Sequence, residues 1–185
     1  MDEGRVVEGG SVSDGGNLLA WLCRVLDDPA TPSWKGPDGH GLTFLPLLGG
    51  ERSTGWKSRA TGAVAGLSLA TGRGDLVQAA LEGIAYRLAE AADRLPGVRE
   101  IVATGRALLA SPEWIQVCAD VLGYTVTASA VQEGSARGAA AYVLERLGVD
   151  PGPAPLGDAF EPDPERTEVY AAARQRQRVM YERLF

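Results

Sequence analysis

Three glycine-bearing turns are the parts of this 185-residue sequence whose residue types and spacing could hold a ligand. They are Ser13-Asp14-Gly15-Gly16 ahead of an expected helix, Thr104-Gly105 after an expected strand, and Gly134-x-x-x-Gly138 near the start of another helix. Backbone N–H groups at a strand-to-helix turn can bind phosphate, and glycine lets a flat base or sugar lie against the main chain. Taken singly, each is more often a tight turn than a ligand loop, so their order and surroundings decide the interpretation.

Side chains that could carry out catalysis are few. His40 is the only histidine, so a Ser–His–Asp triad would have to use it, and a metal site would contain one histidine at most. Cys23 and Cys118 fall in apolar helical patterns and lack metal-ligand spacing, which indicates buried, reduced thiols. The residues alone therefore predict no catalytic group and no metal site.

The composition excludes two classes of partner. The formal net charge is −6 and the isoelectric point is about 4.9. Nucleic acid and anionic membranes both require a basic face, so neither is expected as a partner. No apolar run approaches the ~20 residues of a membrane span, and the acidic N-terminus is unlike a secretory signal. We expect a cytoplasmic protein.

The elements that must position the glycine turns alternate between strand and helix, which indicates an α/β domain. Expected helices span 17–26, 75–94, 111–122, 133–147 and 164–185, and expected strands span 42–47, 62–67, 100–104 and 124–128. Helix 133–147 is rich in small residues, which permit very close packing. The predicted organisation is a domain at 1–148, a Pro- and Gly-rich extended connector at 149–163, and a C-terminal helix at 164–185.

One long stretch carries a family resemblance. Residues 62–82, GAVAGLSLATGRGDLVQAALE, resemble the second signature of the FGGY family of carbohydrate kinases throughout. Flanking stretches resemble further family segments in the family's order: a domain-opening segment at 8–22, a Gly-Glu-Arg turn at 50–52, an adenosine-side motif at 104–123 and a closing helix at 133–140. Within the signature, we expect Asp75 to complement the helix dipole and Glu82 to lie on a solvated helix face.

The resemblance implies an actin-like ATPase (ribonuclease H-like) α/β fold, in which two domains hinge over a cleft and ATP with Mg²⁺ phosphorylates a sugar hydroxyl. This chain resembles the C-terminal half, which supplies much of the nucleotide pocket. By position, Gly16 would lie against the ribose or phosphates, with Leu19 and Ala20 beside the adenosine. Gly105 and the start of helix 111–122 would form the opposite wall. Within the family, the amino-acid sequence looks most similar to gluconate kinases and less similar to xylulose or glycerol kinases.

Two departures from the family pattern bear on function. In the family, the strand at 101–104 normally runs into Gly-Gly, but here it runs into Gly105-Arg106. A second glycine would let a ligand approach the backbone closely, and an arginine at this position does not. The Arg106 side chain would fill the adenine slot, point into solvent or reach a phosphate. The family's catalytic aspartate belongs to a Gly-Asp-Gln motif upstream of the matched region, and this sequence contains no such motif. We therefore expect the chain alone to be inactive, because phosphoryl transfer needs groups around both reactants.

Two main hypotheses follow. In the first, the chain is the C-terminal nucleotide-binding domain of a gluconate- or xylulose-type kinase, and catalysis requires a separate N-terminal half. An apolar docking face would then lead to a partner or to self-association. In the second, the chain is a degenerate, non-catalytic module used for interaction or regulation. A third, an unrelated α/β binding domain, would have to explain the full signature and its flanking motifs.

Overall fold

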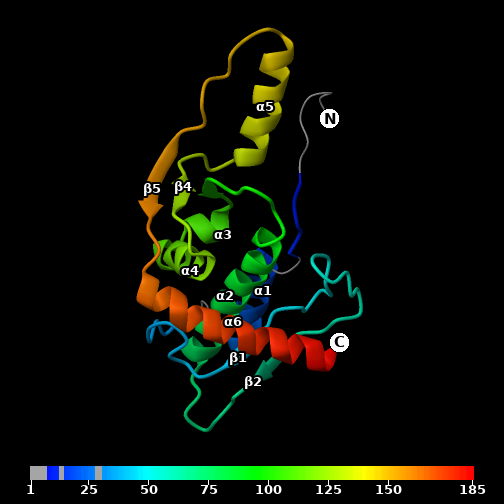
Figure 1. Ribbon diagram of the computed structural model, residues 1–185, viewed down its shortest axis with the longest axis vertical. Helices are drawn as coiled ribbons and strands as arrows, with labels where there is room; N and C mark the ends of the chain where they lie inside the picture. The colour runs from blue at the N-terminus through cyan, green and yellow to red at the C-terminus, as the bar shows by residue number, and fades with distance from the viewer. Residues whose placement is uncertain (1–7, 13–14, 28–30) are drawn as a thin grey trace.

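A computed structural model describes residues 8–12, 15–27 and 31–185 of the protein. In chain order, the elements in these ranges are α1 (Gly15–Leu26), β1 (Thr43–Leu45), β2 (Ala63–Ala65), α2 (Arg73–Ala92), β3 (Ile101–Ala103), α3 (Arg106–Leu109), α4 (Pro112–Leu122), β4 (Val126–Ser129), α5 (Gly134–Arg146), β5 (Leu156–Phe160) and α6 (Pro164–Leu184). Figure 1 shows α6 lying across the lower part of the molecule, while α5 extends from the opposite end. No helix in the described ranges has the length and hydropathy that a membrane span requires.

The central element is α2, which is covered by α1, α4, α6 and β1. Nearly all of its residues between Asp75 and Ala89 are buried, as is typical of a helix enclosed on all sides. Gly83 allows β1 to approach closely, because a Cβ at this position would stand 2.6 Å from the carbonyl oxygen of Phe44. The helical part of the signature stretch, residues 75–82, therefore lies in the core of the fold.

Local signals fix the ends of α4 as the sequence predicts. Ser111 Oγ accepts a hydrogen bond from the Trp114 N–H at 3.3 Å, and Pro112 occupies the first helical position. Gly123 ends the helix with φ of 69°, a left-handed conformation that favours glycine. The helix lies between α2 and the larger sheet, so it contributes to two hydrophobic clusters.

The strands form two separate sheets. The first is the antiparallel pair β1–β2, with Phe44 opposite Val64. In the second, β3 and β4 are parallel, and β5 lies antiparallel on the other side of β4, with Phe160 opposite Val126. Within the predicted connector at 149–163, residues 156–160 form β5 of this sheet. Sequence reasoning missed this strand because its residues are almost all exposed.

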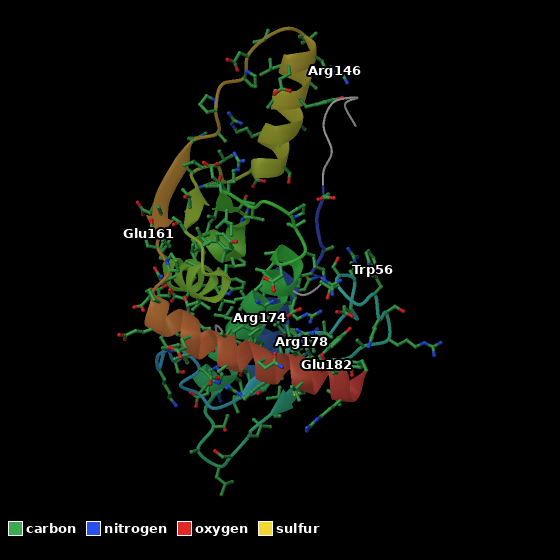
Figure 2. All side chains as sticks on the ribbon, viewed as in Figure 1. Trp56, Arg146, Glu161, Arg174, Arg178 and Glu182 are labelled. Atoms are coloured by element: carbon green, nitrogen blue, oxygen red, sulfur yellow. The ribbon has the colours of Figure 1, made fainter. Side chains whose placement is uncertain are left out.

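Buried side chains and ion pairs attach α6 to the body of the molecule. Tyr170, Ala173 and Gln177 are its buried residues. Arg174 reaches across to α2, where it pairs with Glu90 at 3.0 Å and with Asp93 at 2.5 Å. Farther along, Arg178 pairs with Glu182 on the same helix, and these labelled side chains lie along α6 in Figure 2. The C-terminal helix is therefore an integral part of the fold.

In contrast, α5 has no buried residue. The helix itself forms as expected, but the close packing that its small residues permit is not seen within the described residues. Small side chains permit close packing but do not supply the surface against which to pack.

Candidate functional site

The first predicted wall of the site is α1. Leu18 and Leu22 are buried, and the helix packs against α2. Gly16 and Ala20 lie on the exposed side, and Leu19 is half-buried. A Cβ on Gly16 would meet no atom within 4 Å, so open space lies in front of it. Ser13 and Asp14, the first two residues of this glycine turn, lie outside the described residues.

The opposite wall is the turn between β3 and α3. Gly105 has φ of +100°, which favours glycine, and it lies at the start of the four-residue α3. It is exposed, and a Cβ there would meet no atom within 4 Å. A Cβ on Gly134 would lie 3.1 Å from Thr104 Oγ1. Two of the three glycine turns singled out from the sequence therefore lie side by side.

Arg106 is the first residue of α3, and its side chain points into solvent. The side chain is 91% exposed and lies 3.5 Å from Glu133 Oε1, whose own side chain is 75% exposed. Ion pairs this exposed contribute little to stability. Together with Leu109, Ala110 and Gln132, Arg106 lines a cavity of about 330 Å³. Of the three placements considered from the sequence, the solvent-directed one is observed.

The two predicted walls are built on one core. Leu19 from α1 and both Ala107 and Leu108 from α3 pack against the same hydrophobic cluster, which also contains the buried residues of α2 and α4. A rigid scaffold of this kind holds its attached turns in fixed positions. The structure therefore connects α1 with the β3–α3 turn through α2 and α4.

Asp75, the first acid of the signature, anchors a loop. Its carboxylate lies 2.7 Å from Lys35 Nζ and accepts hydrogen bonds from the Gly72 N–H and from Ser33 Oγ, both at 3.0 Å. The bond from Lys35, followed by the one from Gly72, lowers the pKa of Asp75 to about 2. Asp75 lies in the first turn of α2, as the helix-dipole prediction requires, and it also holds residues 33–35 against the helix.

The prediction that Glu82 lies on a solvated helix face is wrong. Its side chain is fully buried. Oε1 accepts hydrogen bonds from Gln78 Nε2 at 2.8 Å and from the Tyr170 hydroxyl at 3.3 Å, and Oε2 accepts one from the Tyr86 hydroxyl at 3.2 Å. A buried carboxylate is tolerated when donors replace water in this way. The proximity of Glu82 raises the pKa of both Tyr86 and Tyr170, adding to the larger effect of their burial.

His40 completes the surroundings of Glu82. Its Nε2 lies 2.9 Å from Glu82 Oε2, and its Nδ1 accepts the Leu42 N–H at 2.9 Å. Because Nδ1 is an acceptor, the ring proton resides on Nε2 and is donated to Glu82. The single histidine of the chain therefore has a structural partner at each nitrogen.

Asp38, His40 and Glu82 bring three possible metal ligands within 4.8 Å of one another. Their atoms are already engaged, however. Both carboxylate oxygens of Asp38 lie 2.6 Å from one nitrogen of Arg176 on α6, and His40 is bonded at both ring nitrogens. A cation would have to displace these bonds, so the donor set fits a polar anchor better than a metal site.

A buried ion pair joins Glu51 to Arg87 of α2. The sequence analysis did not identify this pair. The Tyr181 hydroxyl of α6 donates to Glu51 Oε2 at 2.6 Å. Burial by itself would raise the pKa of Glu51, but hydrogen bonds from Tyr181 and the Gly55 backbone, together with the charge of Arg87, lower it. Burial and the bond to Glu51 raise the pKa of Tyr181 to about 12. No local pattern marks this pair, because its members lie far apart in the sequence.

Comparison with known proteins places these features in a wider context. The model of the "FGGY family of carbohydrate kinases, C-terminal domain" matches residues 1–143. The glycerol kinase of Beijerinckia indica is 30% identical over 88% of this chain and 36% of its own length. The fold matches two solved structures from Lactobacillus acidophilus, a ligand-bound xylulose kinase (TM-score 0.82) and a gluconate kinase (TM-score 0.80). Each is 24% identical, a level that shows the fold alone, and the match covers 95% of this chain and 39% of the other. The chain therefore spans less than two fifths of the length of these relatives, and the predicted α/β kinase fold is confirmed.

Proposed function

The chain belongs to the FGGY family of carbohydrate kinases, and we propose that it is the nucleotide-side part of an ATP-dependent sugar kinase. The observation that carries this proposal is the open turn after β3. There, Gly105 exposes its backbone in a conformation that favours glycine, beside the start of α5. Such a turn can accept a flat base or a phosphate that a side chain would exclude.

The two walls take different roles in this proposal. Gly16, with open space before it, lies against the ribose or phosphates, and Leu19 and Ala20 lie beside the adenosine. Gly105 forms the opposite wall. Arg106 stands at the mouth of the site with its side chain in solvent, so it leaves the adenine wall open.

Phosphoryl transfer to a sugar would require the rest of a kinase. The buried acids of the described residues are Asp75, Glu82, Glu51 and Asp120. All four are held by hydrogen bonds and ion pairs, Asp120 by Gln116 and Arg166, so none is available to accept a sugar hydroxyl proton. The Asp38–His40–Glu82 group does not fit Mg²⁺, which is usually bound through one or two carboxylates and the phosphates of a substrate. We therefore expect the isolated cytoplasmic chain to bind nucleotide without catalysing transfer, and to need a separate N-terminal half or self-association. The sugar class, gluconate- or xylulose-type, remains a prediction.

Calorimetric titration of the chain with MgATP and MgADP tests the proposal. We expect binding by the unmodified chain, and similar binding by Arg106→Gly, because the arginine side chain is 91% exposed and so leaves the wall accessible. Gly105→Ala should weaken binding by about tenfold or more, because it forces a Cβ into the nucleotide wall.

Gly97→Ala is the matched control, because Gly97 also has a positive φ (66°) and a Cβ there would likewise meet no atom within 4 Å. Both substitutions place an alanine at a positive φ, but only Gly105 lies in the predicted wall. Absence of binding by both the unmodified chain and Arg106→Gly would reject the nucleotide half-site in favour of a non-catalytic module. Equal weakening by Gly105→Ala and Gly97→Ala would reject the placement of the wall.

A further inference from the structure

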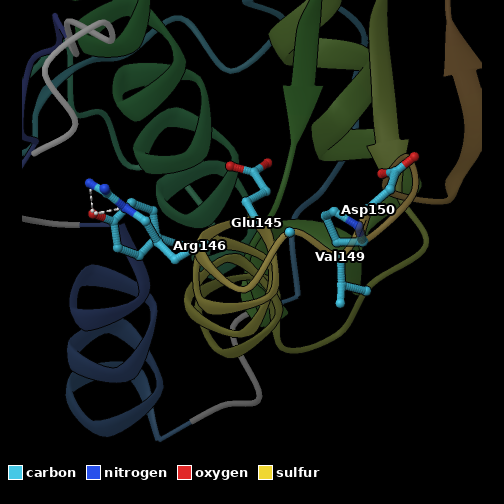
Figure 3. Close-up of a pocket in the computed structure, with 7 residues that line it drawn as sticks. Glu145, Arg146, Val149 and Asp150 are labelled. Carbon is cyan, nitrogen blue, oxygen red and sulfur yellow. Dashed lines mark hydrogen bonds between the residues drawn. The ribbon is translucent and has the colours of Figure 1, made fainter.

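The cavity at the tip of α5 is wide, but it is formed by one short segment of the chain. Its volume is about 520 Å³, and its lining residues all lie between Tyr142 and Pro151. Figure 3 shows Arg146 folded back onto the Tyr142 hydroxyl, which its guanidinium reaches at 3.0 Å. A smaller cavity is formed by segments far apart in the sequence, so it can surround a ligand more completely.

This smaller cavity has a volume of about 190 Å³ and lies between α2, α4, α6 and the loop that precedes β1. We call it the α4–α6 cavity. The lining residues that matter here are Trp34, Gln78, Glu113, Gln116, Arg166 and Tyr170. It shares α4 with the predicted nucleotide site, but Gly16, Leu19, Ala20 and Gly105 do not line it. A cavity of about 150 Å³ can hold benzene, so one small organic molecule fits.

The side chain of Trp34 is held in place on the loop side of the cavity. Trp34 is half-buried and packs against the main hydrophobic cluster. Its φ of 45° is uncommon for a residue other than glycine, and such a conformation persists only when the surroundings impose it. Here Ser33 Oγ donates to Asp75, and the Lys35 N–H donates to Gln78, both at 3.0 Å. Both neighbours of Trp34 are therefore attached to α2.

The most deeply buried polar groups of the cavity have no donor left for a ligand. Gln78 and Tyr170 are each 1% exposed. Gln78 Nε2 donates to the Gly36 carbonyl and to Glu82 Oε1, both at 2.8 Å. The Tyr170 hydroxyl donates to the same Glu82 oxygen at 3.3 Å. An anion would therefore find no free N–H or O–H group on these two side chains.

The α4 side of the cavity offers acceptors. Gln116 Nε2 donates to Asp120 Oδ1 and to the Glu161 carbonyl, both at 2.8 Å, so both of its N–H groups are used. Among the described residues, neither Gln116 Oε1 nor Glu113 Oε1 accepts a hydrogen bond. Glu113 is also exposed, which places its carboxylate at the mouth of the cavity. These oxygens favour a ligand that donates hydrogen bonds.

The charges around the cavity are mainly negative. Glu113 lines it, while Glu82 and Asp120 are bonded to its lining residues. The only cation among the lining residues is Arg166, and its Nε lies 3.0 Å from Oδ2 of the fully buried Asp120. The ring of His40, which is bonded to Glu82, is neutral because its Nδ1 is an acceptor. One cation therefore stands against three carboxylates, which favours a positively charged ligand.

We propose that the α4–α6 cavity binds a small organic cation, an alkylammonium group carried on an apolar or aromatic body. The aromatic rings of Trp34 and Tyr170 attract such a cation. The Glu113 carboxylate accepts a charge-assisted hydrogen bond from it, and Gln116 Oε1 offers a second acceptor. The residues that carry this inference are not those assigned to the nucleotide, so it goes beyond the proposed function.

Titration of the whole chain with three probes of similar shape tests the charge preference. The probes are benzylammonium, neutral benzyl alcohol and anionic benzoate. We expect saturable binding of benzylammonium with a Kd of about 1 mM or tighter, and binding of the other two at least about tenfold weaker. Benzoate binding as tightly as benzylammonium would overturn the proposal, because Arg166 would then set the preference. Equal binding of benzyl alcohol, or no saturation by benzylammonium, would overturn it as well.

Proton–nitrogen NMR of the same titration tests the location. Benzylammonium should shift the signals of the Trp34 indole N–H and the Gln116 side-chain amide, and it should leave the Gly105 amide unchanged. Saturating MgADP should not displace it, because the two ligands use different residues. Shifts confined to other parts of the chain, or displacement by MgADP, would reject the α4–α6 cavity as the site.

A matched pair of glutamates tests the acceptor. Glu113 and Glu165 each follow a proline at the first position of a helix, and both are exposed, but only Glu113 lines the cavity. Glu113→Gln should weaken benzylammonium binding about tenfold or more, whereas Glu165→Gln should leave it unchanged. Equal effects of the two substitutions would overturn the role of Glu113.

Two substitutions of Trp34 test the aromatic contact. Trp34→Leu should weaken benzylammonium binding about fivefold or more, whereas Trp34→Phe, which keeps a ring, should retain most of it. An equal loss in both variants would reject the aromatic contact, and so would full binding by Trp34→Leu. The Glu113→Gln comparison stands even if these variants unfold, because Glu113 is exposed.

Discussion

The region around α2 and α6 differs from the end of the molecule formed by β3 and α5 in how completely its groups are partnered. We call this second region, residues 101–104 together with 134–149, the α5–β3 end. Around α2, three buried acids each have several donors: Glu82, Asp75 and Glu51. At the α5–β3 end, large apolar side chains are exposed and a strand edge is unpaired. The first region is therefore internally satisfied, whereas the second exposes apolar side chains and strand backbone within the described residues.

This difference sets where the stability of the isolated chain resides. A buried charge that loses its partners is strongly destabilising, whereas an exposed side chain away from such networks contributes little. Substitutions around α2 should therefore unfold the chain. Substitutions in α5 should leave the chain folded, because none of its residues is buried.

The largest effect is expected at Glu82. Replacing Glu82 with alanine leaves the donors of His40, Tyr86 and Tyr170 buried without an acceptor. We expect a loss of about 3–5 kcal/mol in the free energy of unfolding, measured by urea denaturation. The control is Glu168→Ala, at an exposed position on α6, which should change stability by less than about 0.5 kcal/mol. A loss at Glu82 no greater than that of the control would show that the acid-centred network is dispensable.

A smaller effect is expected from the titration of Asp75. Its pKa is lowered from 3.8 to about 2, so the carboxylate stabilises the fold fully above pH 3.8. This contribution is lost as the pH falls from 3.8 towards 2, because the unfolded chain then binds a proton that the folded chain does not. Asp75→Asn should unfold more easily than the unmodified chain at pH 7, with the difference shrinking near pH 2.

Chemical denaturation across this pH range measures the Asp75 effect. Asp158→Asn on the exposed strand β5 serves as the control, and its difference from the unmodified chain should be small at every pH. The difference in unfolding free energy between Asp75→Asn and the unmodified chain should therefore depend on pH. A difference that stays constant from pH 7 to pH 2 would contradict the role of Lys35 and Gly72 in stabilising the Asp75 carboxylate.

Sequence reasoning succeeded where the determining signals are local. Ser111, Pro112 and Gly123 predict the ends of α4 because capping acts within one helical turn. It failed at Glu82, because the partners that make burial tolerable, His40 and Tyr170, lie 42 and 88 residues away. The same limit applies to β5, whose pairing with β4 leaves no alternation in its own residues.

In the candidate site, too, features set by local sequence are predictable and features set by distant residues are not. The backbone of Gly105 is predictable, because a strand that runs into glycine before a helix favours an unusual φ, and +100° is observed. The direction of the Arg106 side chain is not, because it depends on Glu133, which lies 27 residues later. The roles of Gly16, Leu19 and Ala20 came from the family resemblance, and they stay predictions until a nucleotide is titrated.

The smallest effect is expected for a leucine in α5, and it tests the comparison most directly. Leu81 on α2 and Leu144 on α5 are both helical leucines, but Leu81 is 3% exposed and Leu144 is 37% exposed. Leu81→Ala should cost about 2–5 kcal/mol of unfolding free energy, because it removes buried contacts and leaves a cavity. Leu144→Ala should cost less than about 0.5 kcal/mol in the isolated chain. A cost at Leu144 close to that at Leu81 would mean that α5 is already packed in solution, which would remove the difference between the two regions. A cost at Leu144 that rises only in the assembled kinase would place the stabilising contacts of α5 in the partner.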